Sequence, residues 1–114
     1  MLVRDMSEAL ELRTLAGGAA LEREIAGGYS ADLLSCVMAR AKSGGVWVTL
    51  QAHPNVVAVA ALLDLAAVII TEDSPVPPEV IAKADSERIP LLASSHTTFW
   101  IVSQLARLGI QAQE

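Results

Sequence analysis

The chain has 114 residues, of which 53% are hydrophobic and only 18% are charged, and its formal net charge is −5. A charged share of about 25% is usual, so this domain has few charges with which to cover its surface, and we expect it to assemble with another chain. The eight basic residues stand singly along the sequence, which argues against a nucleic-acid partner.

The first half of the chain is expected to hold two helices and two short strands. Ser30 is a good N-cap for the second helix, and Asp32 would place a negative charge near the positive end of its dipole. The two strands could lie side by side. The expected elements are a helix at residues 2–10, strands at 12–15 and 21–26, and a helix at 30–42.

The centre of the chain has the pattern of one strand–helix–strand unit. Residues 46–51 are β-branched and aromatic, which suits a strand. Pro54 fits the first turn of the helix that follows, because its missing N–H has no partner there. Residues 68–73 begin with branched side chains and no polar alternation, as in a parallel strand that is covered on both faces.

The last third continues the alternation of helix and strand. A helix is expected from Glu79, with Val80, Ile81 and Ala84 facing inward, then a short strand at residues 89–93 and a helix at 98–108. The inner stripe of that last helix is assigned to Phe99, Val102, Leu105 and Ala106. The whole chain, residues 1–114, is therefore expected to be one layered α/β domain with a mostly parallel sheet of about five strands.

Polar residues follow three of the predicted strands. In an open parallel sheet, ligands bind at the carboxyl ends of the strands. These ends could form a small site for an anion or a metal, although the polar side chains could instead only cap the helices that follow. The candidates for ligand binding are Gln51, His53, Asn55, Thr71, Glu72, Asp73, Ser94, His96 and Thr97.

Two features of the helices favour a subunit interface. Residues 56–63 contain no polar side chain, and a helix that is apolar on all sides is normally enclosed on all sides. Trp100 shares a face with polar residues, as interface anchors often do; it could equally be a half-buried surface aromatic. The interface candidates are Val56, Val57, Ala60, Ala61, Leu63 and Trp100.

The lone cysteine, Cys36, excludes an internal disulfide and fits a reducing compartment, so we expect a cytoplasmic protein. The longest apolar stretch, residues 56–70, is interrupted by Asp64 and is shorter than the ~18 residues that a membrane span needs. No membrane partner is therefore expected. No metal site and no cofactor are expected either. No phosphate loop, nucleophile elbow or zinc motif occurs, and for an enzyme only His53 and His96 could be nominated.

Three stretches carry a resemblance to a known family: GGYSADLLS at residues 27–35, VWVTLQAHPN at 46–55 and IPLL at 89–92. They resemble the stand-alone DRTGG-domain proteins, whose fold is similar to the non-catalytic N-terminal domain of HPr kinase. Related domains occur in bacterial phosphotransacetylases and between the CBS domains of some regulatory pyrophosphatases. The chain departs from the family pattern at Ala52-His53, where Asp-Arg is common, and at Glu72-Asp73, where Gly-Gly follows the threonine.

The resemblance implies a regulatory or assembly module that tends to dimerise and has no established activity of its own. A homodimeric, non-enzymatic regulatory or protein-interaction module is therefore the first hypothesis. The alternative is a small-ligand sensor that binds a nucleotide, a phosphorylated metabolite or a metal at the strand ends.

Overall fold

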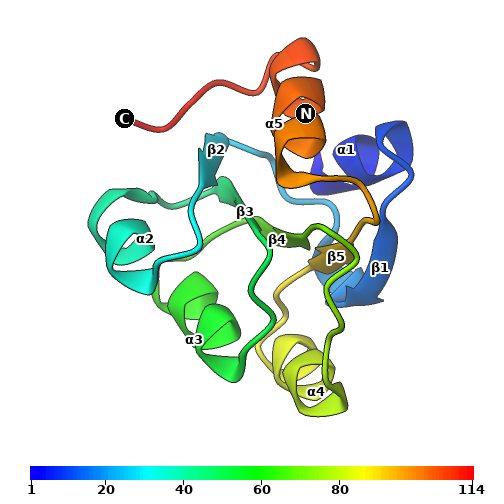
Figure 1. Ribbon diagram of the computed structural model, residues 1–114, viewed down its shortest axis with the longest axis vertical. Coiled ribbons are helices and arrows are strands. Elements are labelled where there is room, and N and C mark those ends of the chain that lie inside the picture. Colours follow the sequence, from blue (N-terminus) through cyan, green and yellow to red (C-terminus); the bar gives the residue numbers. More distant parts are fainter.

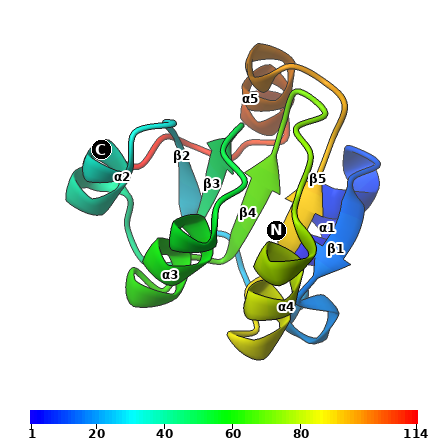
Figure 2. The same ribbon diagram turned by 60° about the horizontal axis from the view of Figure 1, so that its bottom comes forward.

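A computed structural model describes all residues, 1–114, and shows a five-stranded sheet between two layers of helices (Figures 1 and 2). The strand order is β1-β5-β4-β3-β2; all neighbours are parallel except β1 and β5. This arrangement confirms the predicted layered α/β fold with a mostly parallel sheet. The elements are α1 (Val3–Ala9), β1 (Arg13–Ala16), a 3-10 turn (Gly18–Ala20), β2 (Gly27–Ser30), α2 (Leu34–Arg40), β3 (Gly45–Thr49), α3 (Pro54–Leu62), β4 (Ala67–Ile70), α4 (Pro78–Ser86), β5 (Leu91–Ala93) and α5 (Thr98–Arg107).

The core is divided by the sheet into two clusters. Along β3, Trp47 points to the face covered by α2, α3 and α4, whereas Val46 and Val48 point to the face covered by α1 and α5. Successive side chains of a strand point to opposite faces, so both faces of the central strands must be apolar. This explains why β4 carries no polar residue.

The second predicted strand, residues 21–26, was wrong. The observed β2 is Gly27–Ser30, next to β3. Residues 21–26 instead bond to the start of the chain, for example through the N–H of Val3 to the carbonyl oxygen of Arg23 at 2.9 Å. Of the two glycines that looked like a turn, Gly27 is needed in the strand, because a Cβ there would lie 2.9 Å from the carbonyl oxygen of Gln111. The two predicted strands do not pair, since β1 lies at the opposite edge of the sheet.

The predicted start of the second helix was also wrong. The helix begins at Leu34, and the hydroxyl of Ser30 donates to the carbonyl oxygen of Val48 at 3.1 Å. Asp32 does not cap the helix. Its Oδ1 accepts hydrogen bonds from the Thr49 hydroxyl at 2.8 Å and from the Leu50 N–H at 3.0 Å. The short polar side chains of this segment therefore hold the end of β3.

The inner stripe of α5 was assigned correctly at Leu105 but wrongly at Phe99, Val102 and Ala106, which are exposed. Ile101 and Leu105 are buried, whereas Phe99 is 85% exposed and Val102 is 40% exposed. Both stripes are apolar and have helical spacing, so the sequence alone could not choose between them. The stripe that faces the sheet is the one that meets Val48 and Leu92 in the same cluster.

The turn after α3 is tied to two other loops by a carboxylate. Asp64 accepts hydrogen bonds from Arg23 Nη1 to Oδ1 at 2.8 Å, from Arg23 Nη2 to Oδ2 at 2.9 Å and from the Ser43 hydroxyl at 2.6 Å. These hydrogen bonds and the guanidinium charge favour the carboxylate and lower the pKa of Asp64 to about 2.

The low pKa of Asp64 predicts a stability loss in acid. A carboxyl whose pKa is depressed in the folded state contributes stability that is complete above its unfolded pKa and is lost as the pH falls from about 4 through about 2. We expect Asp64→Asn to show a smaller loss of melting temperature than the wild type over that range. The check is a series of thermal melts from pH 6 to pH 2, and parallel curves for the two proteins would contradict it.

Candidate functional site

The carboxyl ends of β3, β4 and β5 lie together at one end of the sheet, toward the viewer in Figure 1 and at the arrowheads in Figure 2. The loops after β4 and β5 are joined there by backbone hydrogen bonds. The N–H of Glu72 donates to the carbonyl oxygen of His96 at 2.8 Å, and the N–H of Asp73 donates to that of Ser94 at 3.1 Å. The structure thus brings together the candidates that follow these two strands.

Thr71 lies at the centre of this junction and is fully buried. Its hydroxyl is 2.6 Å from the hydroxyl of Thr98, the first residue of α5. A carboxylate oxygen of Glu72 accepts a hydrogen bond from the Thr98 N–H at 2.7 Å. An acid at this position complements the positive end of the helix dipole. Thr71 and Glu72 therefore fix α5 to the end of β4.

The two histidines have local roles. His53 is the N-cap of α3, and its Nδ1 accepts from the N–H of Asn55 at 3.0 Å. The His96 ring stacks on Trp100 with ring centroids 3.7 Å apart, and the His96 N–H donates to the hydroxyl of Ser94 at 3.0 Å. Neither ring hydrogen-bonds to a hydroxyl that it could activate as a nucleophile.

The remaining strand-end candidates also bond within their own turns. The hydroxyl of Thr97 caps α5 by accepting from the Trp100 N–H at 3.2 Å. The N–H of Gln51 donates to the Thr49 hydroxyl at 3.1 Å. Gln51, His53 and Asn55 make no hydrogen bond to the loops after β4 and β5. The helix-capping interpretation thus describes the contacts of His53 and Thr97.

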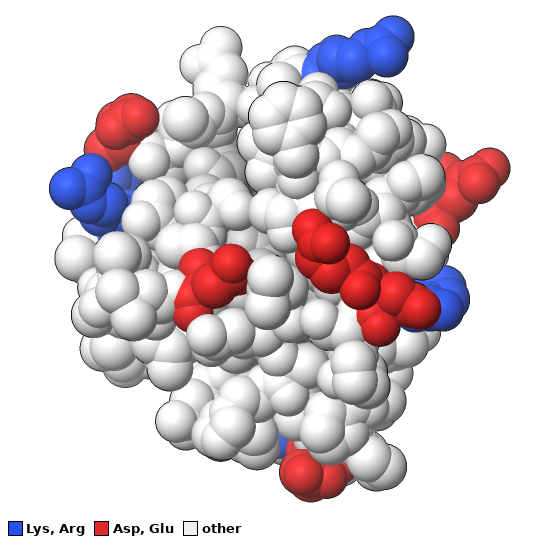
Figure 3. Space-filling view, in the orientation of Figure 1, with Lys and Arg blue, Asp and Glu red and all other residues white.

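The charge at the carboxyl ends of the strands is negative. Asp32 follows β2, and Glu72 and Asp73 follow β4, on the two sides of β3. Figure 3 shows acidic groups near the middle of this face. Like charges raise the cost of bringing a phosphate to the helix N-termini. The arrangement suits a cation or a neutral hydrogen-bonding ligand better than a free phosphate.

The residues after Thr71 are held in the left-handed region, with φ +64° at Glu72 and +54° at Asp73. These are the two positions at which the DRTGG pattern has glycine. A residue with a Cβ is strained there, whereas glycine is not. This chain therefore forms a left-handed tight turn with two acids at these positions.

We expect Asp73→Gly to unfold at higher denaturant than Asp73→Ala, with a difference of about 1 kcal/mol, because only the alanine has a Cβ in the left-handed region. Asp73 is suited to this comparison because its one ion pair, with Arg13 at 3.9 Å, is exposed and weak. Urea unfolding of the two variants measures the difference. Equal stabilities would show that the turn is unstrained.

The interface candidates on α3 are covered by their own chain. Val56, Val57 and Ala60 have no exposed surface, because α3 packs on the sheet between α2 and α4. The sheet and the neighbouring helices thus cover the inner residues of this helix, and only its outer side is left for a partner. Ala61 and Leu63 are partly exposed, and Leu62, between them, is 69% exposed.

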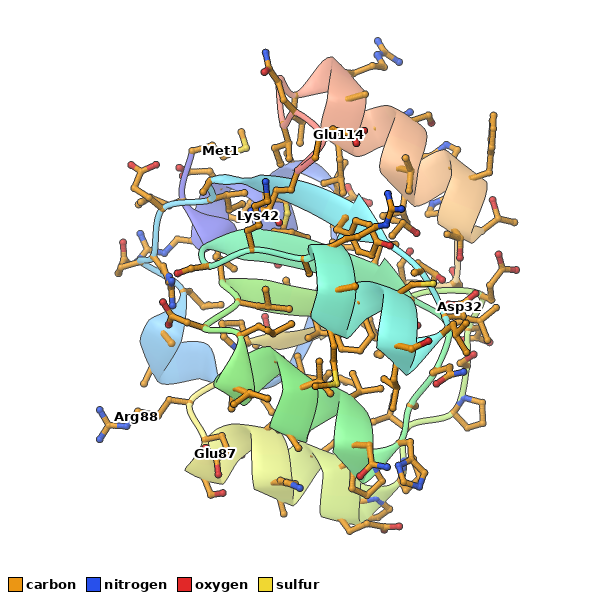
Figure 4. All side chains as sticks on the ribbon, turned by 90° about the vertical axis from the view of Figure 1, so that its left-hand side faces the viewer. Met1, Asp32, Lys42, Glu87, Arg88 and Glu114 are labelled. Carbon is orange, nitrogen blue, oxygen red and sulfur yellow. The ribbon has the colours of Figure 1, made fainter.

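A concave surface lies beside the edge strand β2, where no site was expected. It is a groove of about 700 Å³ between α2 and α5, closed at one end by the C-terminal residues 110–114. Figure 4 looks at this edge and shows Lys42 reaching toward Glu114. Cys36, Ala39 and Arg40 lie on the groove side of α2, but nothing in the sequence pointed to a groove there. The groove residues are Gly28, Tyr29, Ser30, Cys36, Ala39, Arg40, Lys42, Val48, Val102, Leu105, Ala106, Ile110, Gln111, Ala112, Gln113 and Glu114.

Comparison with known proteins identifies the fold and the family model that fits the chain. The model of the DRTGG domain matches residues 31–108. A crystal structure of the CBS and DRTGG domains of the regulatory region of Clostridium perfringens pyrophosphatase, complexed with its activator diadenosine tetraphosphate, superposes with a TM-score of 0.70 at 11% identity. The match covers 99% of this chain and 51% of that one, so the chain spans about half the length of its structural neighbour. No curated protein sequence matches.

Proposed function

Since the chain belongs to the DRTGG domain family, we propose that it is a non-catalytic regulatory module that acts by binding, as a homodimer. The observation that carries this proposal is that nearly the whole chain has the fold of a regulatory region. The use of both histidines and of the strand-end hydroxyls in holding loops supports a role without catalysis. The free thiol of Cys36 supports a reducing compartment, the cytoplasm. No helix is long and apolar enough to cross a membrane.

The dimer surface that the structure favours is on α5. Phe99 is the most exposed large apolar side chain, at 85%, and Val102 lies one turn further on the same side. Trp100 is beside them and half-buried against His96. Aromatic side chains that project from a surface are the usual anchors of an interface. The interface proposed from the sequence at Trp100 is therefore extended to Phe99 and moved away from the buried part of α3.

We expect Phe99→Asp to convert a dimer into a folded monomer, because the charge would lie in a desolvated contact. Leu62→Asp is the matched control, since Leu62 is 69% exposed on α3, on the other face of the sheet. Light scattering at high micromolar concentration gives the mass of each protein, and circular dichroism confirms that each is folded. A wild type that is monomeric under these conditions would exclude the homodimer.

The second candidate function is a small-ligand sensor at the strand ends, for a nucleotide, a phosphorylated metabolite or a divalent metal. The presence of diadenosine tetraphosphate in the neighbouring regulatory region favours it. A thermal-shift screen with those three classes tests it, because a ligand at 100 times its Kd adds about 2.7 kcal/mol of stability. Because the strand ends are acidic, we expect divalent cations, alone or with a nucleotide, to raise the melting temperature more than free phosphates do. A screen without any shift would exclude the sensor.

A further inference from the structure

We propose that the groove at the β2 edge is a binding site for a small amphipathic anion, meaning an apolar body of roughly eight carbons with a carboxylate head. A volume of about 700 Å³ lies within the range of small-molecule sites. Nine of the sixteen lining residues are hydrophobic. This site is separate from the strand-end candidates, and it shares Val102 with the proposed dimer surface.

The apolar part of the ligand would contact α5 and the sheet. Val102, Leu105 and Ala106 form one wall, and Val48 and Ile110 are also among the lining side chains. The outer stripe of α5 leaves Val102 40% exposed, so apolar surface faces this space without a partner from the same chain. Removal of that surface from water favours an apolar ligand.

The charged head of the ligand is indicated by Arg40. Arg40 lies in the last turn of α2 and lines the groove, and no carboxylate of the chain is within ion-pair distance of it. The other cation of the groove, Lys42, donates to the carbonyl oxygen of Glu114. An unpaired guanidinium beside apolar walls is complementary to one carboxylate.

The C-terminal residues 110–114, which line one end of the groove, are held by hydrogen bonds to β2 and to Lys42. The N–H of Gly28 donates to the carbonyl oxygen of Gln111 at 2.8 Å, and the N–H of Gln113 donates to that of Gly28 at 2.9 Å. The Gln113 amide also bonds to both backbone groups of Lys42, at 3.1 and 3.2 Å. Alternation along the strand points the backbone N–H of Ser30 to the same open edge as that of Gly28. Ser30, which also lines the groove, thus offers it a backbone donor.

The probe is octanoate, with 1-octanol as its uncharged analogue, titrated into the full chain and followed by amide chemical shifts. We expect saturable shifts confined to β2, α2, α5 and residues 110–114. Arg40→Gln is expected to weaken octanoate binding about tenfold and to leave 1-octanol unchanged, because only the carboxylate uses the guanidinium. Arg88→Gln is the matched control, since Figure 4 shows Arg88 at the far end of the molecule, beyond α4.

The chain carries its own reporter in the groove. Cys36 is the only cysteine, is partly exposed and lines the cavity. We expect octanoate to slow the alkylation of this thiol by a maleimide severalfold in the wild type and less in Arg40→Gln. Shifts scattered over the surface, equal binding by wild type and Arg40→Gln, or unchanged alkylation at saturating octanoate would each overturn the proposal. Light scattering on the same samples tests the dimer separately.

Discussion

Val57→Asp is expected to unfold the protein. Val57 has no exposed surface and belongs to the cluster between the sheet and α2, α3 and α4. An unpaired carboxylate there loses its hydration and gains no partner, which is expected to cost at least about 4 kcal/mol. Small domains are stable by only about 5–15 kcal/mol. Circular dichroism during urea unfolding would show a strongly reduced midpoint or no transition.

Leu62→Asp is the control for Val57→Asp, because it adds the same charge to the same helix where the side chain is 69% exposed. Its stability is expected to stay within about 0.5 kcal/mol of the wild type. A folded Val57→Asp protein that became monomeric would contradict the structure. That result would mean that α3 is covered by a second chain rather than by α2 and α4.

Trp47→Ala is expected to cost about 3–5 kcal/mol, because it removes the largest fully buried side chain of the core. The indole N–H of Trp47 also donates to the carbonyl oxygen of Ala31 at 2.9 Å. That bond connects β3 to the segment between β2 and α2. Trp47→Phe keeps much of the apolar volume but leaves this acceptor without its donor, so an intermediate loss is expected, about 1–3 kcal/mol. Urea unfolding followed by circular dichroism orders the three proteins.

Trp100→Ala is the comparison for Trp47→Ala. Trp100 is only half-buried, and its ring stacks on His96 at the start of α5. Its removal is expected to cost about 1 kcal/mol in a monomer. A loss as large as that of Trp47→Ala would contradict the placement of Trp47 as the core tryptophan.

The two helix layers explain why the candidate surfaces lie where they do. The apolar residues of α3 are used within the chain, so α3 offers a partner only its outer positions, such as Leu62. The outer stripe of α5 is different, because Phe99 and Val102 project away from the sheet. The proposed dimer surface and the proposed groove therefore both involve α5, at its start and along its side toward β2.

The sequence by itself determined the alternation of strands and helices and their approximate positions. The branched runs that became β3 and β4 are apolar on both faces, and Pro54 stands at the first residue of α3 as expected. These signals are local: side-chain period, β-branching and the missing N–H of proline act within a few residues. They were sufficient for the fold class and for the order of the strand ends along the chain.

Only the tertiary structure decided which neighbours each element has. Gly27 and Gly28 pair with β3, and residues 111–113 bond to the open side of this strand, over a separation that no local pattern records. The same holds for the cover over Val57, the side of α5 that faces the sheet, and the groove around Arg40. The physical reason is that burial and hydrogen bonding between distant segments depend on packing in three dimensions, whereas periodicity shows only that a segment has an apolar face.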